Sequence, residues 1–425
     1  MKIFIATVGT RGDIQPYVAL GKGLMAAGHE VMVCTTANFE SFVTTHGLRY
    51  GYMNSDILKL IDTDSGREAL EQSGGTVARL KAYADLYKQV KPMQARMAAE
   101  AGQAAAQFGP ELVIGHPKAM VSPHLAEKYG VPYVMSLPLP LLTPTAEFPA
   151  LIFPKLPLGA GYNRWTYNLS IKLAWSQYRD VINEWRVRDL GLAPAPKKFN
   201  EMVLANGQPT PTLYPYSEHI LPRPADWPAT TLVPGYWFLE READWRPSAE
   251  LEAFLAAGPP PVYIGFGSMA GKDSAKKAQI ALEALRQTGQ RGLLATGWGG
   301  MAVDKLPETV FKLEAAPHDW LFERVSAVVH HGGAGTTAAG LRAGKPTIIC
   351  PFMADQPFWG SRVAALGVGS EPIPQKKLTA AKLSAAIEQV LGDAALQQRA
   401  TAIGQKISAE DGVGRAVAFI EQYAA

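Results

Sequence analysis

One turn near the start of the chain offers a carboxylate where acid–base chemistry could occur. Asp13 is the only carboxylate in Gly9–Pro16, GTRGDIQP, which follows an apolar strand-like run. A positioned carboxylate can take the proton of a substrate hydroxyl, and this helps because a neutral alcohol is a poor nucleophile. Acids are also favoured in the first turn of a helix by the helix dipole. The pattern alone leaves a catalytic base and a helix cap as alternatives.

A stretch in the second half has the residue types that bind phosphate. It reads HGGAGTT from His331 to Thr337 and follows the apolar run Ser326–Val329. Glycines let the backbone approach a ligand, and a helix start offers free N–H groups and a positive dipole end. The hydroxyls of Thr336 and Thr337 and the imidazole of His331 add side-chain donors. We predict an anion site here.

Two further turns fall at the ends of expected strands. Gly267 and Ser268 follow one such strand, and Asp355 and Gln356 follow another. Open α/β sheets bind ligands at the carboxyl ends of their strands. A tight strand–helix connection is the alternative for the first pair, and an aspartate cap with a solvated glutamine is the alternative for the second.

Strands alternate with helices in both halves, which predicts parallel, doubly wound sheets. With 425 residues the chain is too long for one typical domain and suits two. We place an N-terminal domain at residues 1–220, a linker at about 221–239 and a C-terminal domain at 240–409. The expected strands are Lys2–Val8, Glu30–Thr35, Glu111–Gly115, Pro132–Ser136, Thr212–Tyr216, Pro261–Phe266, Gly292–Thr296, Val310–Leu313, Ala327–His330 and Thr347–Cys350. The expected helices include Pro16–Ala27, Ser122–Tyr129, Asn163–Leu190, Leu378–Leu391, Ala394–Ser408 and Gly414–Tyr423.

Composition restricts the class of protein. Hydrophobic residues make up 47% of the chain and charged residues 19%, which supports large cores. The net charge is +3 without a long basic run, so no nucleic acid is expected as a partner. Cys34 and Cys350 lie in apolar runs and predict buried free thiols, as in a reducing cytosol. We recognise no signal peptide and no membrane-spanning run, and expect a cytoplasmic protein. Peripheral contact of the proline-rich apolar segment Val131–Pro157 with a membrane surface stays open, as does the oligomeric state.

Several linked motifs resemble the nucleotide-sugar signature of the GT-B glycosyltransferases, and among these the sterol glucosyltransferases and their bacterial relatives. These motifs are PHDWLF (Pro317–Phe322), HHGGAGTT (His330–Thr337), LRAGKPTI (Leu341–Ile348), PFMADQPFWG (Pro351–Gly360) and GTRGDIQP at the first turn. The resemblance implies an α/β protein of GT-B fold, with two Rossmann-like doubly wound parallel-sheet domains facing a cleft. It also implies that the final helix, at about residues 410–425, packs back on the first domain.

The resemblance implies a role for each motif residue. Asp13 matches the aspartate that serves as general base in sterol glucosyltransferases. The implied donor-binding residues are Arg11, Gly12, Gly267, Ser268, Pro317, His318, Trp320, His331, Gly333, Gly335, Thr336, Thr337, Asp355 and Gln356. Plant relatives carry a uracil-stacking tryptophan where this chain has Ala315, and a ribose-binding glutamate where it has Ala339. Trp320 is the candidate for the stacking, and UDP and dTDP donors are alternatives.

The acceptor side is apolar. The hydrophobic content of residues 131–175 fits a large acceptor pocket, with ordinary core packing as the alternative for each aromatic residue. The candidate acceptor-binding residues are Pro138, Phe148, Phe153 and Trp175.

The resemblance therefore implies an inverting, UDP-dependent hexosyltransferase that moves glucose from UDP-glucose to a hydroxyl of a lipophilic acceptor, with sterol first. UDP-glucose is a co-substrate, and no cofactor is expected. The sequence Asp62-Thr63-Asp64 has the spacing of a DxD metal motif but lacks its strand context, so we predict no metal.

Other functions remain as alternatives. Another nucleotide sugar could be used on a polyketide, flavonoid, carotenoid or triterpenoid acceptor. A sugar-nucleotide epimerase would need no acceptor region, and an oxidoreductase is disfavoured because the first turn lacks the GxGxxG pattern. A non-catalytic sterol or nucleotide-sugar binding protein would keep its function after Asp13→Asn.

Overall fold

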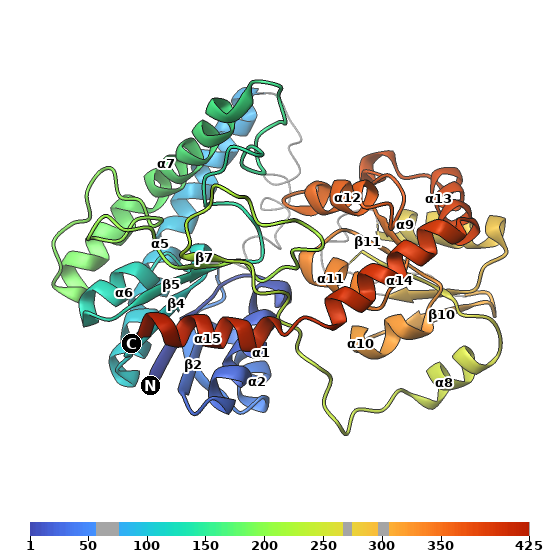
Figure 1. The fold of residues 1–425 in the computed structure, drawn as a ribbon, viewed down its shortest axis with the longest axis horizontal. Helices are drawn as coiled ribbons and strands as arrows, with labels where there is room; N and C mark the ends of the chain where they lie inside the picture. The colour runs from blue at the N-terminus through green and yellow to red at the C-terminus, as the bar shows by residue number, and fades with distance from the viewer. Residues whose placement is uncertain (57–75, 267–273, 296–305, 425) are drawn as a thin grey trace. The chain divides into compact units, whose positions relative to one another are not determined.

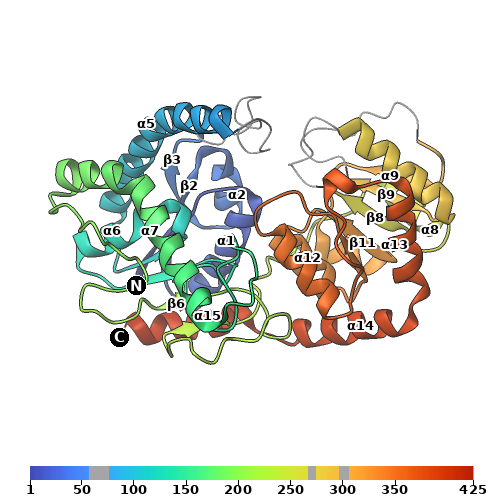
Figure 2. The same cartoon turned by 90° about the horizontal axis from the view of Figure 1, so that it is seen from above.

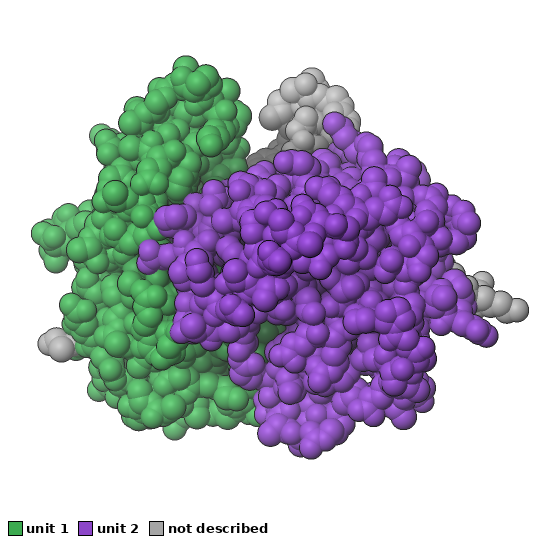
Figure 3. All heavy atoms as spheres, turned by 45° about the vertical axis from the view of Figure 1, so that its right-hand side comes forward, with its two compact units in different colours: residues 1–215, 223–239, 411–425 green, residues 216–222, 240–410 purple. Residues whose placement is uncertain are grey.

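The computed structural model describes residues 1–56, 76–266, 274–295 and 306–424. The chain forms two compact units (Figure 3). Unit 1 contains Met1–Pro215, Arg223–Leu239 and Asp411–Ala425, and unit 2 contains Tyr216–Pro222 and Glu240–Glu410. The segment from 221 to 239, expected as a linker, is divided between the two units.

Unit 1 is built on a parallel sheet of seven strands in the order β3-β2-β1-β4-β5-β6-β7. The chain moves outward from β1 in one direction and then continues from β4 in the other, so a topological switch point lies between these two strands. The strands are β1 (Lys2–Ala6), β2 (Glu30–Thr36), β3 (Arg49–Met53), β4 (Leu112–Gly115), β5 (Tyr133–Ser136), β6 (Thr212–Leu213) and β7 (Thr231–Leu232).

Helices cover both faces of this sheet (Figure 1). Side chains of a strand alternate between faces, so Ile3 and Ile5 of β1 join the core under α1 and α15, whereas Phe4 packs against Phe108 of α5. The helices are α1 (Arg11–Ala26), α2 (Glu40–Thr45), α5 (Thr76–Phe108), α6 (Ser122–Tyr129), α7 (Gly159–Trp185) and α15 (Gly412–Ala424). Short helical turns follow at Ala37–Phe39, Pro117–Ala119 and Arg186–Leu190.

Helix α15 belongs to unit 1 although the residues before it belong to unit 2. It lies against α1 (Figure 2), where a Cβ on Gly23 would stand 2.3 Å from Val413. Its start is anchored because the Trp237 indole N–H donates to the Gly412 carbonyl at 3.1 Å. Ile420 is buried in the same core as α1.

Unit 2 repeats the same plan with five parallel strands in the order β10-β9-β8-β11-β12, and its switch point lies between β8 and β11. The strands are β8 (Val262–Gly265), β9 (Gly292–Ala295), β10 (Val310–Leu313), β11 (Ala327–His330) and β12 (Thr347–Ile349). The helices are α8 (Ala249–Ala256), α9 (Ser274–Thr288), α10 (His318–Leu321), α11 (Ala334–Arg342), α12 (Gln356–Ala365), α13 (Ala380–Gly392) and α14 (Ala394–Ser408). Short helical turns lie at Phe322–Arg324 and Gln375–Lys377.

The predicted class, two parallel α/β sheets, is confirmed. The predicted helix start at Pro16 was wrong, because α1 begins at Arg11, where Thr10 and Asp13 form a capping box. The sequence analysis also missed β3 and α5. Cys34 and Cys350 are buried and unpaired, as predicted. Across the described parts of the chain, no helix combines the length and the apolar character needed to cross a membrane.

Candidate functional site

Asp13 lies in the turn that joins β1 to α1, as the third residue of the helix. Its Oδ2 accepts hydrogen bonds from the backbone N–H of Thr10 at 2.8 Å and from the Thr10 hydroxyl at 3.2 Å. Gly9 makes room for this arrangement: a Cβ there would stand 2.1 Å from Oδ2, and its φ of +146° is rare for any other residue. The turn therefore holds the carboxylate at the carboxyl edge of the sheet.

Two side chains that the sequence analysis did not single out face the other oxygen of Asp13. Lys118 Nζ donates to Oδ1 at 2.7 Å, and His116 Nε2 lies 3.8 Å from the same oxygen. Both residues follow β4, the neighbour of β1 at the switch point. Their position could have revealed them, because HPK comes directly after the predicted strand Glu111–Gly115.

At neutral pH this site holds an ionised carboxylate beside a neutral imidazole. Burial acts to raise the pKa of Asp13, but the charge of Lys118, the nearby His116 and the hydrogen bonds from Lys118 and Thr10 outweigh it and lower the pKa. Burial lowers the pKa of His116 to about 4. Its Nδ1 accepts from the backbone N–H of Lys118 at 3.1 Å, so the neutral ring carries its hydrogen on Nε2. Because the His116 nitrogen that faces Asp13 already carries a hydrogen, Asp13 is the proton acceptor of this pair.

The other predicted residues of this turn, Arg11 and Gly12, are exposed. Arg11 donates to Gln15 at 3.0 Å, and its guanidinium lies 4.8 Å from the centre of the Phe42 ring. A Cβ on Gly12 would meet only the Thr10 hydroxyl, at 3.8 Å. The contacts of Arg11 and Gly12 within unit 1 therefore do not test whether these residues bind the donor.

In unit 2, the turn from β11 to α11 leaves a helix start without a side-chain cap. Gly333 is the N-cap residue, and no side-chain hydrogen bond closes the helix there. Gly332 has a φ of +97°, and a Cβ on it would stand 2.7 Å from Ile349, so this position requires glycine. A Cβ on Gly335 would meet nothing within 4 Å. Open space beside a helix start presents N–H donors to an anion.

The two histidines of this turn differ. His330 is fully buried, and its Nδ1 accepts from the backbone N–H of Gly332 at 2.9 Å, as suits a strand-end residue. His331 is partly exposed as a residue, but its Nδ1 is buried. Its Nδ1 has no hydrogen-bond partner within the described ranges, and burial lowers its pKa to about 4. At neutral pH, His331 is therefore an uncharged side chain in the turn between β11 and α11, and its Nδ1 has no hydrogen-bond partner among the described residues.

Thr337 corrects one prediction. Its hydroxyl was expected to donate to phosphate, but the residue is fully buried and the hydroxyl donates to the carbonyl of Gly333 at 2.9 Å. A hydroxyl has one hydrogen to donate, so the bond to Gly333 leaves Thr337 none for a phosphate. Thr336, which is partly buried, keeps the predicted role.

The loop after β12 is organised by Gln356. Its Oε1 accepts from the backbone N–H groups of Phe352 at 2.7 Å and Met353 at 3.2 Å, and the residue is 3% exposed. Asp355 accepts from an indole N–H four residues later, at 3.0 Å. Ala354 has a φ of +57°, and such backbone strain concentrates at ligand sites.

The structure brings this loop together with the β11 turn. A Cβ on Gly332 would stand 3.1 Å from the Cβ of Gln356, so the two loops touch at one end of the sheet. Gly267 and Ser268, predicted for the turn after β8, lie outside the described residues.

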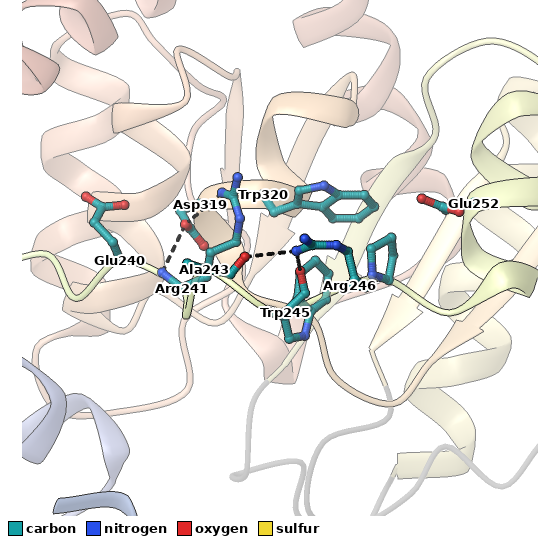
Figure 4. A pocket seen from close by; sticks show the side chains of 9 residues that line it. Glu240, Arg241, Ala243, Trp245, Arg246, Glu252, Asp319 and Trp320 are labelled. Carbon is teal, nitrogen blue, oxygen red and sulfur yellow. Dashed lines mark hydrogen bonds and ion pairs between the residues drawn. The ribbon is translucent and has the colours of Figure 1, made fainter. Parts of the chain in front are cut away.

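Trp320 lines a pocket of about 470 Å³ in unit 2 (Figure 4). Its indole meets that of Trp245 edge to face, with ring centres 5.2 Å apart, and Arg324 stacks on it at 4.4 Å. The pocket is lined by Glu240, Arg241, Ala243, Trp245, Arg246, Pro247, Glu252, Asp319 and Trp320. Of the predicted donor-binding residues that the structure describes, none besides Trp320 lines it, so the predicted stacking role of Trp320 gains no support.

The other two predicted residues of this region are on α10 or at its start. Pro317 is the N-cap residue of α10. The ring of His318 stacks on Phe322, with centres 4.4 Å apart, and meets Tyr263 edge to face at 6.1 Å.

The four predicted acceptor-binding residues are not brought together. Trp175 is 4% exposed and its ring packs 4.7 Å from a phenylalanine ring, so it is a core residue and leaves the acceptor set. Phe153 packs at the surface, 6.1 Å from Trp165. Pro138 and Phe148 lie in the loop between β5 and α7.

Within the described ranges, no group of three or more histidine, cysteine, aspartate or glutamate side chains is placed to hold a metal ion. Asp62 and Asp64 lie outside those ranges.

Two family models match the chain. Residues 3–146 match the glycosyltransferase family 28 N-terminal domain. Residues 298–414 match the erythromycin biosynthesis protein CIII-like, C-terminal domain. The first match includes Asp13 and Lys118, and the second includes His331 and Gln356.

Relatives are similar over almost the whole chain. Two sterol 3-beta-glucosyltransferases of Arabidopsis thaliana are each 38% identical over 98% of this chain, which covers 64% of the first and 67% of the second. A sterol 3-beta-glucosyltransferase of Aspergillus clavatus is 36% identical over 99% of this chain, which covers 29% of it. The chain thus spans about two thirds of the plant relatives and under a third of the fungal one. The resemblance seen in the motifs is confirmed.

Solved structures share the fold. The glycotransferase of kitacinnamycin superposes with a TM-score of 0.72 at 19% identity, over 100% of this chain and 99% of the other. The calicheamicin glycosyltransferase CalG4 gives 0.71 at 19% identity, over 99% and 98%. The Streptomyces glycosyltransferase SsfS6, complexed with thymidine diphosphate, gives 0.62 at 20% identity, over 99% of each chain.

Proposed function

Because this chain belongs to the sterol 3-beta-glucosyltransferase family, we propose that it transfers a sugar from a nucleotide sugar to a hydroxyl group of a lipophilic acceptor. UDP-glucose is the proposed donor and a sterol the first acceptor to try. The observation that carries the proposal is the ionised carboxylate of Asp13, held at the switch point of unit 1 by Thr10 and Lys118. Fold alone would not support an activity, but a base in a fixed position does.

Asp13 is the proposed general base of a single displacement. The acceptor oxygen bonds to the anomeric carbon as the bond from that carbon to the diphosphate breaks. The hydroxyl proton moves to Asp13, and the nucleoside diphosphate leaves with the electron pair of the broken bond. An ordinary carboxylate is a weak base, so the proton transfers late, once the new bond makes the hydroxyl acidic. The anomeric configuration is inverted.

Unit 2 is the proposed donor-binding half. The open start of α11, with Gly333 and Gly335, and the donors of His331 and Thr336 would stabilise the charge that grows on the diphosphate. Neutral imidazole suits this role only as a hydrogen-bond donor, since the pKa of His331 lies at about 4. Asp355 and the NH₂ group of Gln356 are proposed to bind sugar hydroxyls.

The nucleobase and the sugar of the donor are separate parts of the proposal. The pocket that Trp320 lines includes no residue of the β11 turn, so the nucleobase preference of the donor stays open. A second candidate function is therefore transfer from another nucleotide sugar, such as a dTDP-sugar, to a polyketide-like acceptor. It is favoured by solved structures of similar fold, among them SsfS6 with thymidine diphosphate.

We extend the proposal to peripheral contact with a membrane surface, where lipophilic acceptors reside. At one end of α7, Ile152 is 69% exposed and Trp165 54% exposed. Residues 148–179 contain no aspartate or glutamate, and Lys155 and Lys172 are exposed there. Exposed apolar side chains next to lysines suit an anionic lipid surface. Co-sedimentation with phosphatidylglycerol vesicles should weaken in Trp165→Ser and not in the control Val203→Ser, since Val203 is exposed elsewhere in unit 1.

The test of the proposed function is nucleoside diphosphate release from UDP-glucose and dTDP-glucose, with and without a panel of sterols and phenols. Acceptor-dependent release that collapses in Asp13→Asn supports the activity and the base. Release that is the same in Asp13→Asn would overturn the role of Asp13. Nucleotide binding without release from any donor and acceptor would support a binding protein instead.

A further inference from the structure

We propose that Lys118 is a positioning residue for Asp13: its ammonium group fixes one carboxylate oxygen and keeps the base ionised until the acceptor hydroxyl arrives. The inference rests on the proposed function, because it assumes that Asp13 is the base. Nothing in the family models, or in the names of the relatives and solved structures, assigns a role to Lys118.

The pair joins two separate parts of unit 1. Lys118 is 105 positions along the chain from Asp13 and reaches it from the helical turn after β4. That turn is itself held in place, since the Lys118 backbone N–H donates to His116 and the Ala119 N–H donates to the His116 carbonyl at 2.8 Å. Met120, which ends the turn, has a φ of +42° without being glycine. Strain of this kind persists where the surrounding structure requires it.

The two oxygens of the carboxylate have different partners. Oδ2 is taken by Thr10, which belongs to the helix cap, whereas Oδ1 faces Lys118. The cap therefore does not need Lys118. A cation is also disfavoured at a helix start, because the dipole there is positive. A lysine at this place is explained by the carboxylate and not by the stability of α1.

Solvent exposure of the pair is unequal. The Asp13 side chain is 14% exposed, whereas that of Lys118 is 57% exposed. An ion pair with one exposed partner adds little to folding stability. Its effect on the carboxylate is larger, because a shielded acid responds more strongly to a nearby charge. A flexible, exposed lysine can also move aside, which gives an acceptor hydroxyl access to Oδ1.

Above about pH 4, no other group near Asp13 in the described residues replaces this charge. His116 Nε2 lies 3.8 Å from the same oxygen and a protonated His116 also lowers the pKa of Asp13, but burial lowers the pKa of His116 to about 4, so its ring is neutral above that pH. Tyr17 is buried, its hydroxyl donates to the Ser136 carbonyl, and burial raises its pKa, so it carries no charge. Thr10 donates hydrogen bonds without charge. Among the described residues, Lys118 is thus the permanent cation paired with Asp13.

The pairing predicts in which direction the pH dependence of sugar transfer changes when Lys118 is replaced. The active form of the base is the carboxylate, and Lys118 lowers its pKa. Loss of the ammonium group would raise that pKa, so the acid limb of the pH profile would move to higher pH. A neighbouring cation shifts a carboxyl group by about 1 pH unit or more.

The experiment compares pH profiles of kcat/KM for the wild type, Lys118→Met, Lys118→Arg and the control Lys198→Met, since Lys198 is exposed elsewhere in unit 1. Met keeps much of the length of the side chain without the charge, and Arg keeps the charge. We expect an acid limb about 1 pH unit higher in Lys118→Met, little change in Lys118→Arg, and none in Lys198→Met. An unchanged acid limb in an active Lys118→Met would overturn the inference and leave the proposed function intact.

A second readout needs no turnover. Carbon-13 NMR follows the titration of the Asp13 carboxyl group, assigned with Asp13→Asn, in the same full-length proteins. An upward shift in Lys118→Met supports the pairing even if no donor is turned over, in which case the proposed function fails separately. Identical titration in the wild type and Lys118→Met would overturn the inference.

Discussion

The two units use the same strand–turn–helix element in opposite ways. In unit 1, the turn after β1 fills the start of α1 with its own carboxylate, because Asp13 accepts from the N–H of Thr10. In unit 2, the turn after β11 leaves the start of α11 without a side-chain cap. One helix start is thus already occupied by an anion, whereas the other is free to receive one. The comparison leads to the prediction that a carboxylate in the first turn of the helix separates a turn that supplies a base from one that binds a phosphate.

Removal of the internal anion should have the largest effect. Asp13→Asn keeps the shape and loses the base, so we expect kcat/KM to fall roughly 10²–10⁴-fold. The affinity for the nucleoside diphosphate, measured by calorimetry, should stay within about twofold, because donor binding is assigned to unit 2. A matching loss of nucleotide affinity would break the contrast between the two turns.

Insertion of an anion into the open turn is the reverse test. Gly335→Asp places a carboxylate in the first turn of α11, and like-charge repulsion should weaken nucleoside diphosphate binding roughly 10–100-fold. Gly335→Ala is the control, since a Cβ there meets nothing within 4 Å. Equal affinities of the two variants would show that the anion binds elsewhere.

Acid should destabilise both turns in the same pH window. Burial lowers the pKa of His116 and of His331 to about 4, whereas an unfolded histidine titrates near pH 6.5. Between these values the unfolded state binds more protons, so stability falls as pH drops. Each imidazole contributes at most about 1.4 kcal/mol per pH unit. Denaturant unfolding at pH 7 and pH 5 gives the loss of unfolding free energy in the wild type, His116→Gln and His331→Gln. We expect a smaller loss in each variant, and a loss as large as that of the wild type in both would contradict the prediction.

The smallest expected effects separate the two threonines of α11. Thr336→Val should weaken nucleoside diphosphate binding by about 1 kcal/mol, or several-fold, with little loss of stability. Thr337→Val should do the opposite, since its buried hydroxyl donates to Gly333. Calorimetry and thermal unfolding distinguish the pair, and the reversed pattern would return the phosphate contact to Thr337.

The sequence predicted the ends of strands better than the partners that meet there. Asp13 and His331 were singled out because glycine turns after apolar runs are local signals. Lys118 was missed because its pairing with Asp13 depends on β4 lying beside β1, which no local pattern reveals. Thr337 was misplaced because helical phase decides which side chain faces the ligand. Trp175 was misplaced because an aromatic residue in a buried helix looks the same in sequence whether it lines a pocket or the core.

Helix α15 has a consequence for the order in which the protein is made. It completes the core of unit 1, but the ribosome synthesises it after every residue of unit 2. Until then the part of this core that α15 contributes is missing beside α1, while unit 2 can already close around its own sheet. The unit that starts first thus finishes last, and for this interval the nascent chain exposes a surface that chaperones and aggregation both recognise.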